Sequence, residues 1–465
     1  MAKAPPTSRL VRATALGRLA AGQVLRQAGT KVAGLGRSSE KRQLLLDRRA
    51  LAAADQLVSV LGGMKGAAMK LGQLLSVLDL DLVPDSSRPE FRRKLAVLLA
   101  KAPAVPFSGM RKVAEDDWGA PIAEVFAEFD RNPVAAASIG QVYRARLHDG
   151  RAVAVKVQYP GIATAVRADL KNLALFLRLA PNIFPGLEMG SLAEEIRLRI
   201  EEELDYRLEA ETQHELAVQY AGHPFIAIPD SVAELCGPRV LVTEFVEGMD
   251  FDGIAEQPRD VRDRVGEIIY RFYCGSLFHT GDFPGDPHPG NVLLRHDGRV
   301  AFLDFGLFKR MSPESIHLER TVLRAAADGD AEQVHARMAA AGILGEPDRI
   351  EPDEVLAYIE DAVGWYLADA EIEATPELAA EAMISSIDPR SPHYRKMRWQ
   401  YLPPEHLFAR RAELYAFGLL GRLRARGNWH RIAREWLHGD EPATELGQVD
   451  AKWRAGDTPE GYEPR

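Results

Sequence analysis

The sequence predicts an α+β protein with a helical extension, then a small antiparallel sheet, then a larger and mostly helical half. Three observations carry this prediction. Apolar residues recur at alternating spacings of four and three from Leu57 to Leu78, which indicates an amphipathic helix. Strand-like alternation begins near Ala127, and helical periodicity dominates from residue 249 to about 438.

Composition places the chain among folded globular proteins. Of its 465 residues, 46% are hydrophobic and 27% are charged, which excludes collagen-like and wholly disordered classes. No stretch reaches the roughly 18 uncharged apolar residues of a membrane-spanning helix. Two cysteines, Cys236 and Cys274, cannot make a disulfide framework or a four-ligand zinc site, and no secretory signal opens the chain. We therefore expect a reducing, cytoplasmic compartment.

The first 39 residues form a basic arm, because they contain seven Lys and Arg residues and no Asp or Glu, although the whole chain has a net charge of −9. The arm could form an amphipathic helix that lies peripherally on anionic lipid, or it could be an organelle transit peptide. A frayed basic terminus is the third interpretation. The acidity of the whole chain argues against nucleic acid as a partner, because phosphate binding needs clustered cations.

The segments group into five regions. We expect a basic flexible arm over 1–39, a helical extension over 40–126, a small lobe over 127–248, a helical lobe over 249–438 and a loose polar tail over 439–465. The expected helices span about 109–115, 163–179, 192–220 and 261–279. The expected strands span 142–146, 152–157, 239–245, 292–294 and 300–303.

The sharpest chemical signal lies in the helical half. Asp286 is followed five residues later by Asn291, and Asn291 is followed thirteen residues later by Asp304 of an Asp-Phe-Gly triplet. In kinases an aspartate at the first position orients or deprotonates the acceptor, and the asparagine and second aspartate bind magnesium. A hairpin with its turn at 296–298 would return the two metal ligands to the same end of a sheet. The pattern predicts a bilobed, protein-kinase-like fold that binds Mg²⁺ and ATP or ADP.

The predicted nucleotide cradle departs from the usual glycine-rich loop. Ala135, Ala136, Ala137 and Ser138 stand where kinases have glycines, so the grip on phosphate should differ. Lys156 ends a strand at the position of the lysine that contacts the α and β phosphates. By position alone, Glu244 and Val246 would offer backbone groups to adenine.

The acidic segment 201–211 supplies candidate partners for cations. If it forms one continuous helix, Glu203 and Glu209 lie about 120° apart around the axis, whereas Asp205 and Glu209 lie only about 40° apart. One helix could then serve two different cations.

These motifs together resemble the UbiB family of atypical kinases, also called AarF-domain or ADCK proteins. The segment from Lys70 to Gln73 matches the family's KxGQ motif, and Glu203 with Asp205 matches its ExD motif. The alanine-rich loop, Lys156, and the motif from Asp286 to Asp304 complete the resemblance. It implies that the KxGQ helix covers the pocket where a kinase admits a peptide, that Lys70 pairs with Glu203, and that Glu209 pairs with the strand lysine.

The resemblance further implies an ATPase or a small-molecule or lipid kinase, rather than a peptide kinase, that supports ubiquinone or other isoprenoid-lipid metabolism at membranes. A lipid or quinone precursor is then the expected second ligand. No Ala-Pro-Glu follows Asp-Phe-Gly, which agrees with the loss of peptide-kinase activity, and Ser312-Pro313-Glu314 reads as a helix cap and first turn. From the sequence we do not expect the paired C-terminal transmembrane helices that some bacterial members of this family have.

Two alternatives stay open from the sequence. An aminoglycoside- or choline-phosphotransferase-like kinase shares the Asp286 to Asn291 loop but lacks a KxGQ cover helix, so Lys70, Gln73 and Glu203 discriminate against it. A nucleotide-gated, lipid-binding scaffold without catalysis is the second alternative. The retention of all the metal and phosphate ligands argues against that scaffold.

Overall fold

The computed structural model describes residues 105–179, 201, 203–387 and 403–456. The chain divides into two compact units. Unit 1 takes Met1–Leu208 and Ala233–Val242, and unit 2 takes Glu209–Val232 and Thr243–Arg465. The predicted arm over 1–39, and all but the last part of the predicted extension over 40–126, lie outside the described residues. Among the described helices, none is both long enough and apolar enough to cross a bilayer.

Unit 1 is built around a five-stranded sheet with the order β1-β3-β4-β6, to which β2 is added beside β3. Its described elements are α5 (Phe107–Trp118), α6 (Ile122–Val125), β1 (Glu128–Phe129), β2 (Ala135–Ala136), β3 (Gly140–Arg146), β4 (Ala152–Gln158), α7 (Ile162–Leu179), the 3-10 helix η2 (Ala233–Leu235) and the first part of β6 (Val240–Glu244). Strands β1, β2 and β4 each pair antiparallel with β3. The predicted small antiparallel sheet is thus confirmed.

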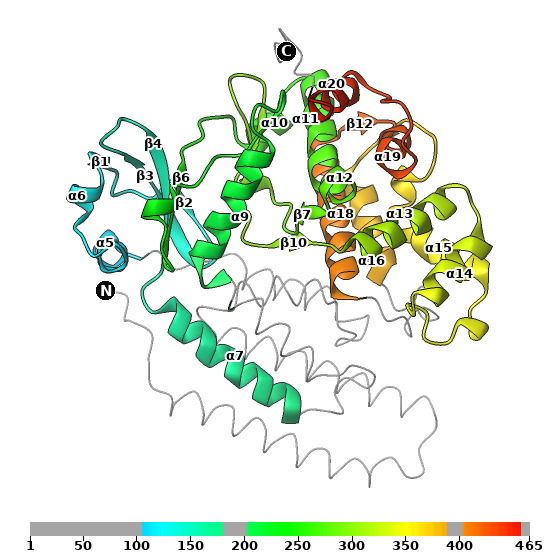
Figure 1. Ribbon diagram of the computed structural model, residues 1–465, viewed down its shortest axis with the longest axis horizontal. Helices are drawn as coiled ribbons and strands as arrows, with labels where there is room; N and C mark the ends of the chain where they lie inside the picture. Colours follow the sequence, from blue (N-terminus) through cyan, green and yellow to red (C-terminus); the bar gives the residue numbers. More distant parts are fainter. Residues whose placement is uncertain (1–104, 180–200, 202, 388–402, 457–465) are drawn as a thin grey trace. The chain divides into compact units, whose positions relative to one another are not determined.

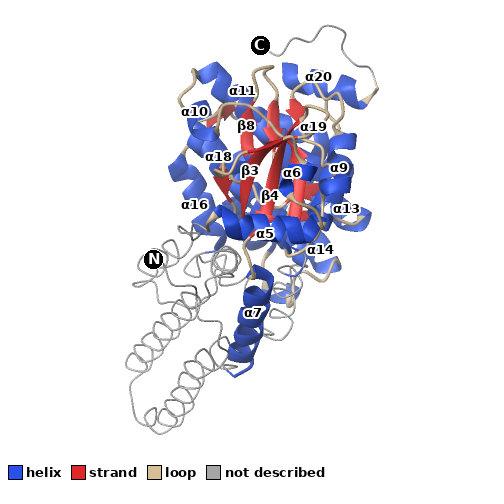
Figure 2. Ribbon diagram, turned by 90° about the vertical axis from the view of Figure 1, so that its left-hand side faces the viewer, coloured by secondary structure: helices blue, strands red, loops and turns tan. Residues whose placement is uncertain are grey.

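Alternating burial along β3 and β4 gives this sheet one apolar face, because Val153, Val155 and Val157 are all at most 1% exposed. Helix α5 packs against β4 (Figure 2). Phe107 of α5 lies with its ring centroid 5.7 Å from that of Tyr143 on β3. The core of unit 1 therefore lies between the sheet and this short helix.

Unit 2 contains most of the helices among the described residues. Its described elements are α9 (Tyr206–Gln219, from Glu209 on), β5 (Ile226–Ala227), α10 (Phe251–Ala255), α11 (Arg259–Tyr270), the π-helical segment η3 (Arg271–Gly275), α12 (Ser276–Thr280), β7 (Asp282–Pro284), the 3-10 helix η4 (Pro289–Asn291), β8 (Val292–Leu294), β9 (Val300–Phe302), β10 (Phe308–Arg310), α13 (Pro313–Ala327), α14 (Ala331–Ala340), the 3-10 helix η5 (Pro347–Arg349), α15 (Pro352–Val363), the 3-10 helix η6 (Gly364–Tyr366), β11 (Ile372–Glu373), α16 (Pro376–Ile387), α18 (Pro404–Leu423), β12 (Arg426–Gly427), α19 (Trp429–Leu437) and α20 (Glu445–Arg454).

An aromatic core holds unit 2 together. Phe272 and Phe302 stack with ring centroids 3.8 Å apart, and Trp365 stacks on Phe417 of α18 at 4.2 Å. The predicted helix over 261–279 is confirmed as α11, η3 and α12 in succession, with a π-helical turn in the middle. All five residues of that π-helical turn are buried. Such turns are rare and are often found at functional sites.

Of two predictions about helices, the cap at Ser312 is confirmed and the single helix over 192–220 is not. Ser312 caps α13 as predicted, because its hydroxyl accepts the Ser315 amide and Pro313 occupies the first turn. The single helix predicted over 192–220 is wrong, since the chain leaves helical geometry at Leu204 and Asp205 before α9 begins. Asp205 accepts a hydrogen bond from the Arg207 amide, a bond that competes with continuation of a helix.

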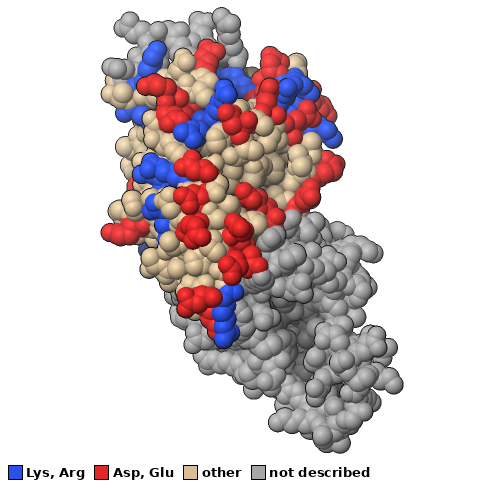
Figure 3. Space-filling model, turned by 90° about the vertical axis from the view of Figure 1, so that its right-hand side faces the viewer, with Lys and Arg blue, Asp and Glu red and all other residues tan. Residues whose placement is uncertain are grey.

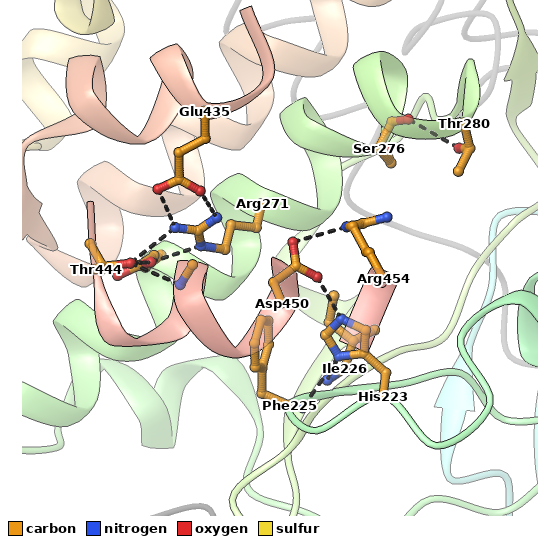
Figure 4. A network of polar contacts seen from close by, with 12 residues as sticks. His223, Phe225, Ile226, Arg271, Ser276, Thr280, Glu435, Thr444, Asp450 and Arg454 are labelled. Atoms are coloured by element: carbon orange, nitrogen blue, oxygen red, sulfur yellow. Dashed lines mark hydrogen bonds and ion pairs between the residues drawn. The ribbon is translucent and has the colours of Figure 1, made fainter. Parts of the chain in front are cut away.

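The predicted loose tail over 439–465 is also wrong for its described part. Helix α20 packs against the core of unit 2, with Leu446 and Asp450 buried. Asp450 accepts a hydrogen bond from His223 and is ion-paired with Arg454 (Figure 4). The polar appearance of the tail misled the prediction, because its acidic residue satisfies buried partners instead of facing water.

A second buried polar group joins the same tail to the helical core. Arg271 of η3 bonds Glu435 through two nitrogens, at 2.7 and 3.0 Å, and also donates to the Thr444 hydroxyl (Figure 4). On the outer face shown in Figure 3, by contrast, basic and acidic side chains are intermixed over the described residues. Unit 2 therefore has buried charged side chains that are paired with each other, in addition to the charged side chains on its surface.

Candidate active site

Two short strands of unit 2 bring the catalytic-loop and metal motifs together. Strand β7 ends two residues before Asp286, and β10 begins four residues after Asp304. The two strands, which lie side by side in Figure 1, pair antiparallel, and beyond the pair the Gly285 amide donates to the Leu307 carbonyl at 2.6 Å. This pairing places the start of the catalytic loop beside the Asp-Phe-Gly segment.

Strands β8 and β9 hold the second predicted metal ligand, Asn291, in the same region. They form the predicted hairpin, pairing antiparallel from Val292 with Phe302. The Leu303 amide donates to the Asn291 carbonyl at 3.1 Å, so Asn291 lies next to the residue that precedes Asp304. The 3-10 helix η4 delivers Asn291, and His288 caps it by accepting the Gly290 amide on Nδ1.

The Asp-Phe-Gly segment is anchored by its phenylalanine, because Phe305 is buried in the core at 2% exposure. Asp304 stays partly exposed, and its Oδ1 accepts the Gly306 amide at 3.0 Å. A Cβ at Gly306 would lie 3.4 Å from Oδ1 of Asp304 and 3.4 Å from Oε2 of Glu209. Two carboxylates thus flank a glycine that keeps the space between them open.

The donor set fits magnesium. Asp304 and Asn291 supply one carboxylate and one amide oxygen, and Mg²⁺ usually takes only one or two carboxylates beside phosphate oxygens and water. Glu209 is 7% exposed and, like Asp304, lies against Gly306. Within the described residues there is no cluster of three or more His, Cys, Asp or Glu side chains that would hold a metal by themselves. The phosphate of a nucleotide would have to complete this site.

Two residues of this site were not predicted. Arg411 of α18 donates from Nη2 to Oδ1 of Asp286 at 3.3 Å. Tyr273, in the π-helical turn, is 3% exposed, and the pKa of its phenol is raised by burial and by the negative charges of Asp286 and Asp304. Neither residue belongs to a motif, and Arg411 is 125 residues from its partner along the chain. No signal in a single sequence would have found either of them.

The alanine-rich loop of unit 1 is a tight hairpin. Ala135 and Ala136 form β2, opposite Val142 and Gln141 of β3, and the Ala137 amide donates to the Gly140 carbonyl at 2.9 Å. Ala135 and Ala136 are exposed, and Ser138 is half-buried. The position of this hairpin before the strand pair is the one predicted for the phosphate cradle.

Gly140, at which β3 begins after that hairpin, allows β3 to lie close to β4. A Cβ there would lie 2.3 Å from the Val157 carbonyl oxygen, a contact with backbone that cannot be relieved by a rotamer change. Glycine is therefore required at this position for β3 to approach β4. Gly140 comes after the three alanines in the sequence. The loop before it therefore keeps the alanine methyl groups, while β3 keeps its register with β4.

Lys156 lies on β4 opposite Val142, as predicted for the strand lysine. Its ammonium lies 5.0 Å from the centroid of the buried Tyr206 ring, within the range of a cation–π contact. The predicted pair of Lys156 with Glu209 joins residues of different units and stays a prediction.

In the ExD motif, Asp205 accepts a hydrogen bond from Nε of Arg207 at 2.9 Å, and that hydrogen bond lowers the pKa of the Asp205 carboxyl.

The other predicted contacts stand as follows. Lys70 and Gln73 lie outside the described residues, so their pairing with Glu203 stays a prediction. Glu244 ends β6, and its amide donates to the Asp230 carbonyl at 2.9 Å. An adenine contact from Glu244 would therefore have to use its carbonyl. Val246 follows in the half-buried segment after the strand and stays a prediction as well.

The sheet of unit 1 and the motif cluster of unit 2 define a kinase-like protein. A family model described as the ABC1 atypical kinase-like domain matches residues 97–338, a little over half of the chain. The chain belongs to this family, which includes the UbiB, AarF and COQ8 atypical kinases. The predicted family resemblance and fold class are confirmed.

Individual relatives agree with the family match. The AarF domain-containing protein kinase 1 of Xenopus laevis is 33% identical over 325 residues, which is 68% of this chain and 61% of that protein. The mitochondrial atypical kinase coq-8 of Caenorhabditis elegans is 33% identical over 60% of this chain and 37% of its own length. The chain therefore spans less than two thirds of these curated relatives.

A solved structure covers more of the chain. It is the complex of Rv3197 with erythromycin from Mycobacterium tuberculosis, and its protein is 31% identical to this chain. The match covers 86% of this chain and 98% of the solved one, with a TM-score of 0.62.

Proposed function

We propose that this atypical kinase binds Mg²⁺ and ATP and transfers the γ-phosphoryl group to water or to a small or lipid-like acceptor, rather than to a peptide. The observation that carries the proposal is the convergence of Asp286, Asn291 and Asp304 in unit 2 through the β7–β10 and β8–β9 pairs. Phosphoryl transfer needs little covalent chemistry from the protein, so positioning and charge are the main requirements.

Each residue then has one role. Asn291 and Asp304 would hold Mg²⁺, which when bound neutralises charge on the phosphate oxygens. Asp286 orients the attacking hydroxyl or water. Lys156 would contact the phosphates. Glu209, which lies against Gly306 beside Asp304, would pair with Lys156. The hairpin from Ala135 to Ser138 covers the phosphates.

Family membership together with the sequence motifs supports the proposed acceptor class. Relatives are named as the mitochondrial atypical kinases coq-8 and COQ8B. This supports a role in quinone or isoprenoid-lipid metabolism, with a lipid or quinone precursor as the second ligand. Family membership favours this function over the aminoglycoside-phosphotransferase-like alternative. We further propose that the protein works inside the cell, peripherally at a membrane reached by residues 1–39; import into an organelle is the other location compatible with such relatives.

ATP turnover by the purified full-length protein tests this function. We expect magnesium-dependent release of phosphate or transfer to an isoprenoid phenol, measured with and without liposomes. Asp304→Asn should abolish turnover and also the thermal stabilisation by MgADP, because it removes the carboxylate ligand. Asp297→Asn, in the exposed β8–β9 turn, is the matched control and should behave as wild type.

The outcomes separate the alternatives. Stabilisation by MgADP without turnover under any condition would favour the nucleotide-gated scaffold. Undiminished stabilisation of Asp304→Asn by MgADP would remove the metal assignment. Competition by erythromycin, the molecule bound to the related Mycobacterium tuberculosis protein, would show whether a second ligand shares the site.

A further inference from the structure

We propose that Arg411 of α18 is a positioning residue for the reaction, which holds the carboxylate of Asp286 in the orientation that receives the acceptor. This inference rests on the proposed function, because it assigns Asp286 the acceptor-orienting role. It adds a residue from the C-terminal part of the chain, well beyond the family-model match over 97–338, to the machinery of the catalytic loop.

The surroundings of Arg411 favour a single polar partner. Its side chain is 8% exposed, and its Nη2 lies 3.3 Å from Oδ1 of Asp286. Its Nε is buried with no hydrogen-bond partner among the described residues. The guanidinium lies 5.0 Å from the Tyr415 ring centroid, one helical turn further along α18. Within the described part of the chain, Asp286 is thus the one group that compensates the buried charge of Arg411.

Helix α18 is fixed in rotation by its neighbouring residue. Arg410 bonds Glu413 at 2.6 Å and is also ion-paired with Glu319 of α13. His406 adds a second bond from α18 to Glu319, at 2.7 Å. Since consecutive side chains on a helix diverge by about 100°, the anchoring of Arg410 on α13 fixes the direction in which Arg411 leaves the helix. The helix that carries Arg411 is therefore held in place where Arg411 contacts the catalytic loop.

The contact suits an orienting carboxylate better than a strong base. A guanidinium on Oδ1 restricts the rotation of the Asp286 carboxylate, which leaves Oδ2 to accept the hydrogen bond of the attacking hydroxyl. At 3.3 Å the contact is longer than the 2.7–2.9 Å of a tight charge-assisted bond, and contacts of this kind often shorten when substrate binds. Because the transition state of phosphoryl transfer is loose, orientation matters more than basicity.

Three variants test the assignment in the full-length protein. Arg411→Met removes the charge and keeps an unbranched apolar chain, and Arg411→Lys keeps the charge. Arg422→Met is the control, since Arg422 is on the same helix, half-exposed and paired with Asp252. We expect Arg411→Met to lower kcat by about 10- to 100-fold. The KM for ATP and the stabilisation by MgADP should stay within about twofold of wild type, and Arg411→Lys should recover part of kcat.

A double-mutant cycle with Asp286→Asn separates positioning from a general structural effect. Arg411→Met should cost less than about twofold in kcat when Asp286 is already replaced, because the two residues act as a unit. An equal loss in both backgrounds, or a loss carried by KM for ATP with kcat unchanged, would overturn the assignment.

The same cycle on stability does not depend on turnover. Asp286→Asn and Arg411→Met should each lower the urea midpoint of the full-length protein, and the double variant should lose less than the two losses added together. Additive losses would show that the two side chains are not coupled and would overturn the inference. If the stability cycle shows coupling between Arg411 and Asp286 but the wild-type protein turns over no ATP with any acceptor, the proposed function is wrong and the contact between the two residues stands.

Discussion

His223 uses its two ring nitrogens for different partners. Nδ1 lies 3.3 and 3.0 Å from the amides of Phe225 and Ile226, so it must be an acceptor, and Nε2 therefore carries the proton that is donated to Asp450 (Figure 4). A second proton on the ring would have to sit on Nδ1, where both amides point. The folded state is thus built for a neutral imidazole.

We expect this histidine to make the protein acid-sensitive. The pKa of His223 is lowered because burial penalises the charged ring more than Asp450 favours it. In the unfolded chain the ring titrates near 6.5. Stability from the neutral ring is therefore complete above about pH 6.5 and is lost as the pH falls below that value, by up to about 1.4 kcal/mol per pH unit.

Urea unfolding followed by tryptophan fluorescence at pH 7.5 and 5.5 measures this loss. His223→Gln should be less stable at pH 7.5 but should lose less on acidification, because an amide does not titrate. His296→Gln, in an exposed turn, should keep the pH dependence of wild type. An unaltered pH dependence in His223→Gln would assign the acid sensitivity to other groups.

The arrangement of the catalytic-loop residues was largely predictable, because it depends on short spacings, whereas their chemical roles remain predictions. Asp286 and Asn291 are five residues apart, and a three-residue hairpin arm leads to Asp304. Arg411 was not predictable, since its contact with Asp286 is created by packing of α18 against the core. The continuous helix assumed for Glu203 and Glu209 was wrong for a local reason, the hydrogen bond that the Arg207 backbone amide donates to the carboxylate of Asp205.

At the level of elements, two helical glycines differ in what surrounds them. A Cβ on Gly266 of α11 would lie 2.4 Å from Cβ of Ala425, which follows α18. A Cβ on Gly418 of α18 would meet nothing within 4 Å. The first glycine is therefore required for the packing of the two elements, and the second is not.

Replacement of each glycine by alanine should consequently shift stability in opposite directions. Gly418→Ala should stabilise by up to about 1 kcal/mol, the difference in helix propensity. Gly266→Ala should destabilise, because overpacking costs about 1–3 kcal/mol and exceeds the propensity gain. Thermal and urea unfolding of the two single variants check this. Equal shifts in both would show that the approach of α11 to Ala425 is not tight.

Element lengths explain which strands the sequence revealed. Strands β3 and β4 are seven residues each and alternate clearly, so their pairing was predicted. Strands β7 and β10 are three residues each, too short for any periodicity, and their pairing depends on the fold around them. The β7–β10 pair, which places Asp286 beside the Asp-Phe-Gly segment, was thus the part of the site that was hardest to predict from the sequence.

On the scale of the whole molecule, the chain crosses between the two units within single elements. Helix α9 begins in unit 1 and contributes Glu209 to unit 2, and β6 begins in unit 1 and ends in unit 2. A division at residue 248, as the periodicity suggested, misses these crossings because sequence periodicity reports elements and not their packing partners. The other predicted region boundaries remain predictions.

The basic arm gives a prediction for the full-length protein. Deletion of residues 1–39 should weaken sedimentation with vesicles that contain anionic lipid, because the arm has seven cations and no acidic residue. Binding by wild type should fall with added salt, as expected of a screened attraction. Zwitterionic vesicles are the control. Equal sedimentation of both proteins would support the frayed-terminus interpretation.

The docking of α20 has a consequence for biosynthesis. The catalytic loop leaves the ribosome more than 150 residues before Asp450, yet the carboxylate partner of His223, Asp450, and the hydroxyl partner of Arg271, Thr444, both belong to the tail segment. Until that segment emerges, the nascent chain carries polar groups in its interior without these counterparts. A translation stop shortly before residue 444 would therefore yield a chain with every metal and acceptor motif in place and a defective core beneath them.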